Sequence, residues 1–157
     1  MATKVPTGLE IAEKSKNIRL YEDSRLHPEP ADRETKVTFI PAKLHQFESL
    51  QEIEEGQVLG VLETDLEGDE TNLPKGKYNI YLTKVDGDWQ AYAEAHGKIA
   101  AKAARVSLQK HYLYECEMTK PTFHSKGWCF TYCLVGYCVG WGPFKKCWCL
   151  YSVKICF

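Results

Sequence analysis

The sequence predicts a mainly β protein: a β-rich N-terminal domain with a meander, followed by a small disulfide-rich tail. Three observations lead to this expectation. Residues 78–95 alternate in side-chain character around a tight turn, two β-rich runs flank a Gly- and Pro-containing segment in the tail, and six of the seven cysteines lie in the last forty residues. At 157 residues, the chain has the length of one ordinary domain or of a small domain with an appendage.

The first third of the chain shows weak patterns. Residues 1–35 mix charge with three prolines, which predicts an extended arm with a short helix around residues 9–17. Residues 36–40 are a β-rich run that Pro41 ends, and residues 57–63 form a second apolar run. Between these two predicted strands, residues 44–54 have room for one or two helical turns.

The meander is the clearest pattern. Residues 78–85 and 89–95 alternate in side-chain character, and Asp86-Gly87 between them is a strong hairpin-turn signal. His96-Gly97 predicts a second turn. In residues 98–108 the alanines favour a helix, whereas the preceding turn and the β-branched end favour a strand, and we expect a strand.

Charge divides the chain unevenly. Residues 1–117 hold all 21 Asp and Glu and 15 of the 20 Lys and Arg, a net charge of −6. Residues 118–157 have five lysines and no acid, a net charge of +5. We therefore expect an acidic β-rich domain over residues 36–117 and a cationic, aromatic tail over residues 118–157.

The cysteine spacing in the tail is compatible with a β-hairpin. A hairpin centred on residues 140–145 pairs positions whose numbers sum to 285, which places Cys138 opposite Cys147 and Cys129 opposite Cys156. The two pairs are nine positions apart, so one falls at a hydrogen-bonded position unless a bulge shifts the phase. Two further cysteines face opposite sides of this hairpin. These two are Cys133 and Cys149.

The same spacings also resemble a known family. Cys129-x3-Cys133, Gly136-x-Cys138 and Cys147-x-Cys149 are similar to the cysteine-stabilised αβ pattern of defensins and related toxins. The resemblance implies that Cys-x3-Cys lies on a helix, and it implies specific bridges. These bridges are Cys129–Cys147 and Cys133–Cys149, with Cys138 left for Cys116 or Cys156. The tail departs from the family by having only four residues between Cys133 and Cys138.

Two other interpretations of the cysteines remain open. A thiolate site for zinc or an iron–sulfur cluster is one, although the spacings differ from the Cys-x2-Cys knuckle. Buried core thiols are the other. For the disulfide interpretation, the candidates are Cys129, Cys133, Cys138, Cys147, Cys149 and Cys156, and Cys116 is the expected free or interchain thiol.

No enzyme motif is present. The chain lacks the glycine-rich phosphate loops, the zinc-protease helix and the nucleophile elbow, and its five histidines are scattered. We expect no catalytic residues, no cofactor, no metal and no nucleic-acid partner.

The tail carries features of a membrane-contacting segment. Residues 127–144 are 18 residues without a charge, with lysines outside both ends and tryptophans near them, which is the lower limit for a spanning helix. Their glycines and proline weaken a helix, and two hairpin strands fit as well. The stronger inference is that a cationic, Trp-rich, cross-linked surface binds anionic membrane interfaces; the alternative is that the aromatics fill the core of a small domain. The expected membrane contacts are Trp128, Trp141, Phe144, Lys145, Lys146 and Trp148.

The overall organisation resembles the precursor of a cysteine-rich antimicrobial peptide or bacteriocin. This resemblance implies that the acidic domain is a carrier or shield for a membrane-active toxin, with a cut near residues 116–120. The alternatives are an assembly subunit, joined as a homo-oligomer through strands and an interchain disulfide, and a metal-binding module. Residues 1–20 show no secretory signal, so we expect a cytoplasmic protein that is then secreted or released by a non-classical route.

Overall fold

The protein is mainly β, and its described residues form two antiparallel sheets, two short α-helices and one 3₁₀ helix. The computed structural model describes residues 5–20, 37–42, 50–64, 73–115, 122–124, 129–144 and 146–157. The elements are α1 (Gly8–Ser15), β1 (Val37–Pro41), α2 (Leu50–Glu54), β2 (Gln57–Thr64), β3 (Gly76–Val85), β4 (Asp88–Ala95), β5 (Lys98–Lys102), β6 (Arg105–Glu115), β7 (Thr122–His124), β8 (Cys129–Val139), the 3₁₀ helix η2 (Gly142–Phe144) and β9 (Lys146–Cys156).

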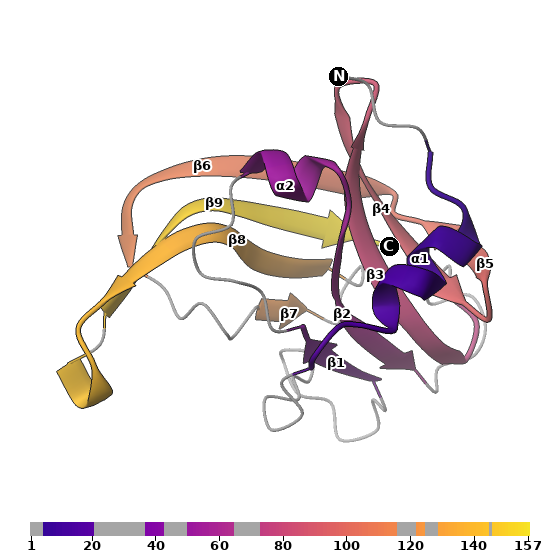
Figure 1. The fold of residues 1–157 in the computed structure, drawn as a ribbon, viewed down its shortest axis with the longest axis horizontal. Helices are drawn as coiled ribbons and strands as arrows, with labels where there is room; N and C mark the ends of the chain where they lie inside the picture. The colour runs from indigo at the N-terminus through magenta and orange to yellow at the C-terminus, as the bar shows by residue number, and fades with distance from the viewer. Residues whose placement is uncertain are drawn as a thin grey trace.

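The first sheet is a meander of five strands in the order β1-β2-β3-β4-β5 (Figure 1). The predicted turns are confirmed: φ is 49° at Asp86 and 86° at Gly87, and 54° at His96 and 77° at Gly97. Two consecutive residues with positive φ are the signature of the type I′ turn, whose twist matches that of the strands it joins. The turn dipeptides therefore account for both hairpins.

The second sheet has the order β6-β9-β8-β7, so β9 lies between β6 and β8. The ambiguous residues 98–108 form strands, as expected, but they contribute to both sheets: β5 pairs with β4, and β6 pairs with β9. The sheets therefore divide between β5 and β6, whereas the sequence places the change of character at Glu117. A strand of the expected acidic domain is thus paired with the last strand of the expected tail.

The two sheets share one hydrophobic core. Ile80 and Leu82 of the first sheet are fully buried in the same cluster as Val153 and Ile155 of β9. Phe157, directly after β9, belongs to this cluster too. Because the C-terminal strand supplies core residues for the first sheet, the tail packs as part of the fold.

The opposite face of the meander is covered by α1, the helix predicted around residues 9–17. Ile11 packs there against Val58, Tyr81 and Tyr92. The helix begins at Gly8, whose backbone lies so close to the β4–β5 turn that a Cβ atom would sit 2.3 Å from the carbonyl oxygen of Gly97.

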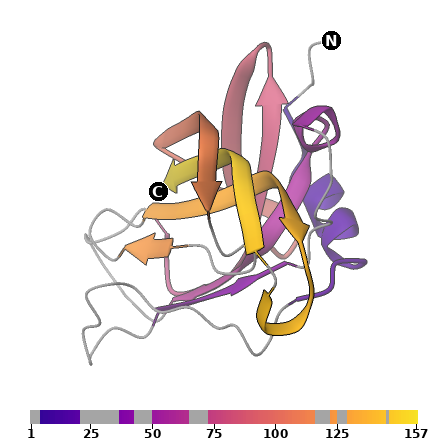
Figure 2. The ribbon, with the colours of Figure 1, turned by 90° about the vertical axis from the view of Figure 1, so that its left-hand side faces the viewer.

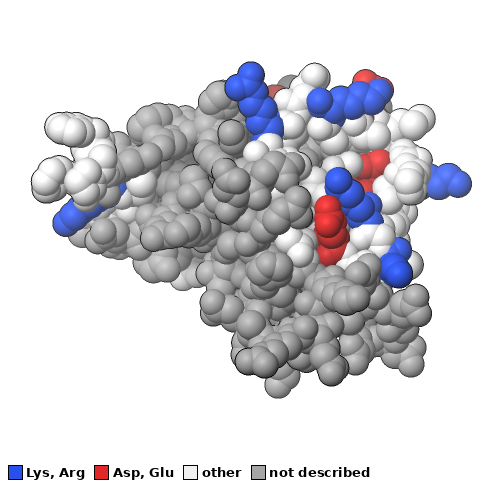
Figure 3. All heavy atoms as spheres, turned by 90° about the horizontal axis from the view of Figure 1, so that it is seen from below, with Lys and Arg blue, Asp and Glu red and all other residues white. Residues whose placement is uncertain are grey.

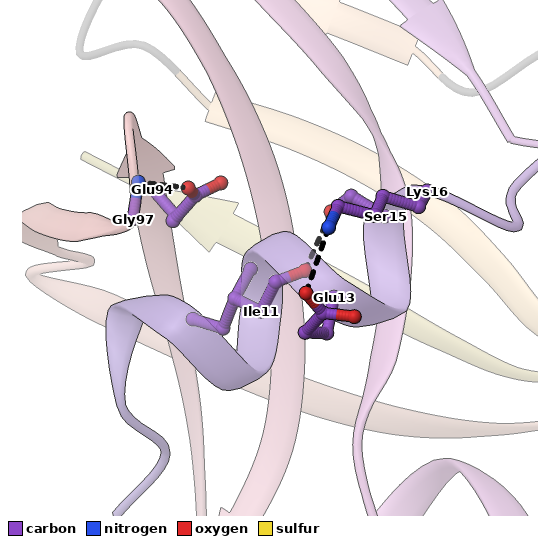
Figure 4. Close-up of polar contacts among 6 residues, drawn as sticks. All are labelled: Ile11, Glu13, Ser15, Lys16, Glu94 and Gly97. Atoms are coloured by element: carbon purple, nitrogen blue, oxygen red, sulfur yellow. Dashed lines mark hydrogen bonds and ion pairs between the residues drawn. The ribbon is translucent and has the colours of Figure 1, made fainter.

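Polar contacts hold both the helix and the turn beside it (Figure 4). Ser15 Oγ donates to the carbonyl oxygen of Ile11 at 2.7 Å, and the buried Glu94 carboxylate accepts from the Gly97 amide at 2.8 Å. The Asn79 side-chain amide donates to the other Glu94 oxygen at 2.7 Å. Both oxygens of this buried carboxylate thus accept hydrogen bonds from neutral donors, as buried polar groups generally do.

Candidate functional site: the tip of the disulfide hairpin

The cysteine-rich tail is a β-hairpin made of β8 and β9. A disulfide joins Cys129 to Cys156, with a Cα–Cα distance of 4.1 Å, and a second joins Cys133 to Cys149, with a Cα–Cα distance of 5.9 Å. Cys129 and Cys156 lie directly opposite each other in the ladder, as the hairpin interpretation predicts.

Two bulges explain why the second disulfide is compatible with the hairpin. The paired residue numbers sum to 285 at Cys133↔Ser152 and to 286 at Val135↔Tyr151, and the sum is 285 again at Gly136↔Cys149. Leu134 is therefore an extra residue on β8, and Leu150 is an extra residue on β9. The bulges compensate, and they bring the second pair of bonded cysteines to diagonal positions on one face of the ladder.

These bulges overturn one expectation from the regular hairpin, which placed Cys133 and Cys149 on opposite faces. The defensin-like pattern implies this bridge correctly, but two of its other implications are wrong. The Cys-x3-Cys segment is strand, because it pairs with both β7 and β9, and Cys129 is bonded to Cys156 instead of Cys147. The hairpin is thus the arrangement that the chain adopts.

The remaining cysteines lie near the end of the hairpin or outside the described residues. Cys147 is also disulfide-bonded, and the residue opposite it in the ladder is Cys138. Cys116 lies outside the described residues. A sulfur in a disulfide is not the thiolate that zinc or iron–sulfur clusters require, so the disulfides disfavour a thiolate centre here. Among the described residues, no three His, Cys, Asp or Glu side chains are grouped as metal ligands.

The loop between β8 and β9 is the most exposed apolar feature in the described part of the chain. Trp141 is 79% exposed and Phe144 is 75% exposed, and Val139 at the end of β8 is 51% exposed. Figure 1 shows this loop, with η2, at the end of the long hairpin and beyond the meander, and in Figure 2 this end of the molecule faces the viewer. We call residues 139–146 the hairpin tip.

The hairpin tip itself is cationic, while the neighbouring strand β6 ends in an acid, Glu115, which is paired with Trp148. Lys146 is exposed at the start of β9, and no acid occurs between residues 118 and 157. In Figure 3, the coloured surface at the left end of the molecule shows uncharged atoms with Lys or Arg, and no Asp or Glu. The tip therefore combines exposed aromatic area with positive charge.

Dividing the chain between the two sheets, after residue 104, gives the same net charges as dividing it at the predicted boundary after Glu117. Residues 1–104 contain 13 Lys and Arg and 19 Asp and Glu, a net charge of −6. Residues 105–157 contain seven and two, a net charge of +5. The negative net charge thus belongs to the part of the chain that contains the meander, and the positive net charge belongs to the part that contains the second sheet.

The other predicted membrane contacts have different positions. Trp148 is partly buried on β9, whereas Trp128 and Lys145 lie outside the described residues. Two exposed apolar residues were not predicted as contacts: Val139, at the start of the tip, and the bulge residue Leu150 on β9, which is 38% exposed. The apolar character of the two β-rich runs in the tail was the available signal for them.

The hydrophobic tail does not form a membrane-crossing helix in the described residues, because its central part is the strand β8. None of the described helices has the length and apolar character to span a bilayer.

Comparison with protein-family models, with curated proteins and with solved structures finds no match. The geometry of the hairpin tip is therefore the feature from which a function is inferred.

Proposed function

We propose that the protein is a non-enzymatic, membrane-binding protein that inserts its hairpin tip into anionic membrane interfaces. The observation that carries the proposal is the position of Trp141 and Phe144, about three quarters exposed on a projecting loop. Exposed apolar patches on a protein surface, especially ones bordered by polar residues, mark sites that contact a protein or a membrane. Aromatic rings also favour the headgroup level of a bilayer.

The energies are adequate for reversible binding. Trp and Phe side chains present on the order of 150–250 Å² each, so burying half of this area at about 25 cal/mol per Å² contributes roughly 5 kcal/mol before orientation costs. Each lysine near an anionic surface adds about 1 kcal/mol. Lys146 at the tip and the absence of acids in residues 118–157 thus favour anionic lipid over neutral lipid.

The covalent bracing of the hairpin supports the same function. Cys129–Cys156 and Cys133–Cys149 tie β8 to β9 behind the tip. A loop that is held in its binding conformation before contact loses less conformational entropy on binding. The acidic part of the chain then faces away from the lipid, because its charge is repelled by the anionic surface.

Vesicle co-sedimentation tests the proposal. The protein should bind vesicles of mixed phosphatidylglycerol and phosphatidylcholine, and the double substitution Trp141→Ala and Phe144→Ala should weaken binding by at least about tenfold, because it removes most of the inserted area. Leu9→Ala is the matched control, since Leu9 is 70% exposed on α1, away from the tip. Equal binding by the double variant and the wild type would refute the proposal.

Charge-reversal substitutions measure the electrostatic contribution of the tip lysines to vesicle binding. Lys145→Glu with Lys146→Glu should abolish binding at low salt, while Lys98→Glu with Lys102→Glu on β5 should change it little, because only charges near the lipid act strongly. If both pairs of substitutions weaken binding equally, binding depends on the overall charge of the protein and not on the lysines of the hairpin tip.

The antimicrobial or bacteriocin-like role is the finer form of this proposal. The membrane-binding tip and the disulfides support it, and dye release from bacterial-type anionic vesicles tests it. Release should require Trp141 and Phe144. Binding without release would leave a membrane-attachment function and remove the toxic one.

A further inference from the structure

The end of the hairpin next to the tip contains a disulfide cysteine whose partner the register indicates. Cys147 is disulfide-bonded and lies directly opposite Cys138. Four of the other six cysteines are already joined in pairs, Cys129 with Cys156 and Cys133 with Cys149. Only Cys138 and Cys116 are therefore left as partners for Cys147.

The ladder favours Cys138. When only paired residues are counted and the two bulge residues are skipped, the pair Cys138↔Cys147 lies eight steps along the ladder from the pair Cys129↔Cys156. Eight is an even number. Side chains alternate between the two faces of a sheet, so an even spacing returns to the same face. The two strands therefore place this pair on the face that already holds the other disulfides.

We infer that Cys138 and Cys147 form a third disulfide that closes the hairpin tip, and that its reduction releases the membrane-binding conformation of the loop. The inference rests on the proposed function and adds the redox control of the same site. The bond closes a loop whose interior is residues 139–146, which contains both exposed aromatic residues. The other two disulfides lie farther from the tip, so they restrain the strands more than the loop.

The chemistry requires an external dithiol. A thiolate of the dithiol attacks one sulfur of the Cys138–Cys147 bond and forms a mixed disulfide, and its second thiol then displaces the remaining cysteine. The products are two protein thiols and one oxidised dithiol, a two-electron reduction of the protein. The loop between residues 138 and 147 then gains conformational freedom, which increases the entropy cost of seating Trp141 and Phe144 in lipid.

Disulfide mapping tests the bond itself. Proteolysis of the oxidised full chain without reductant, followed by mass spectrometry, should give linked peptides that contain Cys138 and Cys147. Linkage of Cys147 to Cys116 would overturn the assignment, and so would the detection of Cys138 as a free thiol.

Vesicle binding tests the consequence. The double substitution Cys138→Ser and Cys147→Ser should weaken binding to phosphatidylglycerol-containing vesicles by about tenfold, and dithiothreitol should then have little further effect at concentrations that leave the other bonds intact. The matched control is Cys129→Ser with Cys156→Ser, which removes the disulfide farthest from the tip and should change binding less than threefold.

The outcomes separate the two proposals. If the wild-type protein does not bind vesicles, the membrane function fails while the mapping still decides the disulfide. If the wild type binds and the Cys138→Ser and Cys147→Ser variant binds equally well, with its other two disulfides and its circular dichroism spectrum unchanged, the redox control is refuted and the membrane function stands.

Discussion

Single residues determine how closely α1, α2 and the meander approach one another. Gly56 adopts φ +116°, and a Cβ atom there would lie 1.6 Å from the hydroxyl oxygen of Tyr81. The same hydroxyl accepts a hydrogen bond from Lys14 Nζ of α1 at 3.0 Å. Gly56 therefore makes room for the tyrosine that connects the helix to β3.

Substituting Gly56 should be costly for a steric reason. Gly56→Ala should lower the free energy of unfolding by about 3 kcal/mol, because it combines backbone strain with overpacking against Tyr81. Gly87→Ala is the matched control: it has φ +86° but no atom within 4 Å of the new Cβ, so only the backbone cost of about 1–2 kcal/mol applies. Urea unfolding measures both, and equal losses would contradict the steric explanation.

At the scale of elements, the paired bulges in the disulfide hairpin are the feature that the sequence hides. Leu134 and Leu150 are the extra residues, one on each strand, and together they restore the register. A regular alternation pattern counts every residue, so it assigns cysteines beyond a bulge to the wrong face.

Deletion variants should reveal this compensation. Removing Leu134 alone, or Leu150 alone, shifts the register by one position between the two ends of the hairpin and should prevent simultaneous formation of its disulfides. Removing both residues preserves the register, so the double deletion should form Cys129–Cys156 and Cys133–Cys149 in higher yield than either single deletion. Disulfide mapping measures the yields, and an additive loss in the double deletion would argue against compensating bulges.

Patterns among neighbouring residues predicted the strands and turns better than they predicted which strands pair with each other. The turns at Asp86-Gly87 and His96-Gly97 and the alternation of residues 78–95 are encoded in neighbouring residues, and the structure has them as expected. The pairing of β6 with β9 joins residues about fifty apart, for example Arg105 with Cys156, and no local pattern specifies it. The exposed Trp141 and Phe144 were predicted from composition, whereas the core role of Val153 depends on the tertiary fold.

At the scale of the whole molecule, the shared core should make the two sheets unfold together. Ile155 on β9 is 1% exposed and packs in the cluster that contains Ile80 and Leu82. A domain with one core usually unfolds in a single cooperative transition. We therefore expect the acidic and cationic parts to unfold as one thermodynamic unit, whatever their separate charges.

A core substitution on β9 should therefore weaken the meander as well. Ile155→Ala should reduce the free energy of unfolding by about 2–5 kcal/mol, and hydrogen exchange should quicken in β3 as much as in β9. Leu150→Ala on the same strand is the control, since this residue is 38% exposed and its truncation should cost less than about 1 kcal/mol. Protection that stays unchanged in β3 would show that the sheets are independent.

The central position of β9 also has a consequence for how the chain is made. The ribosome completes β6 and β8 before β9, yet β9 is the strand that pairs with both of them. Until β9 emerges, β6 lacks its sheet partner and the core face of the meander lacks Val153 and Ile155. Completion of the second sheet and closure of the shared core must therefore follow synthesis of this last strand, so the nascent chain exposes apolar surface that the finished protein buries.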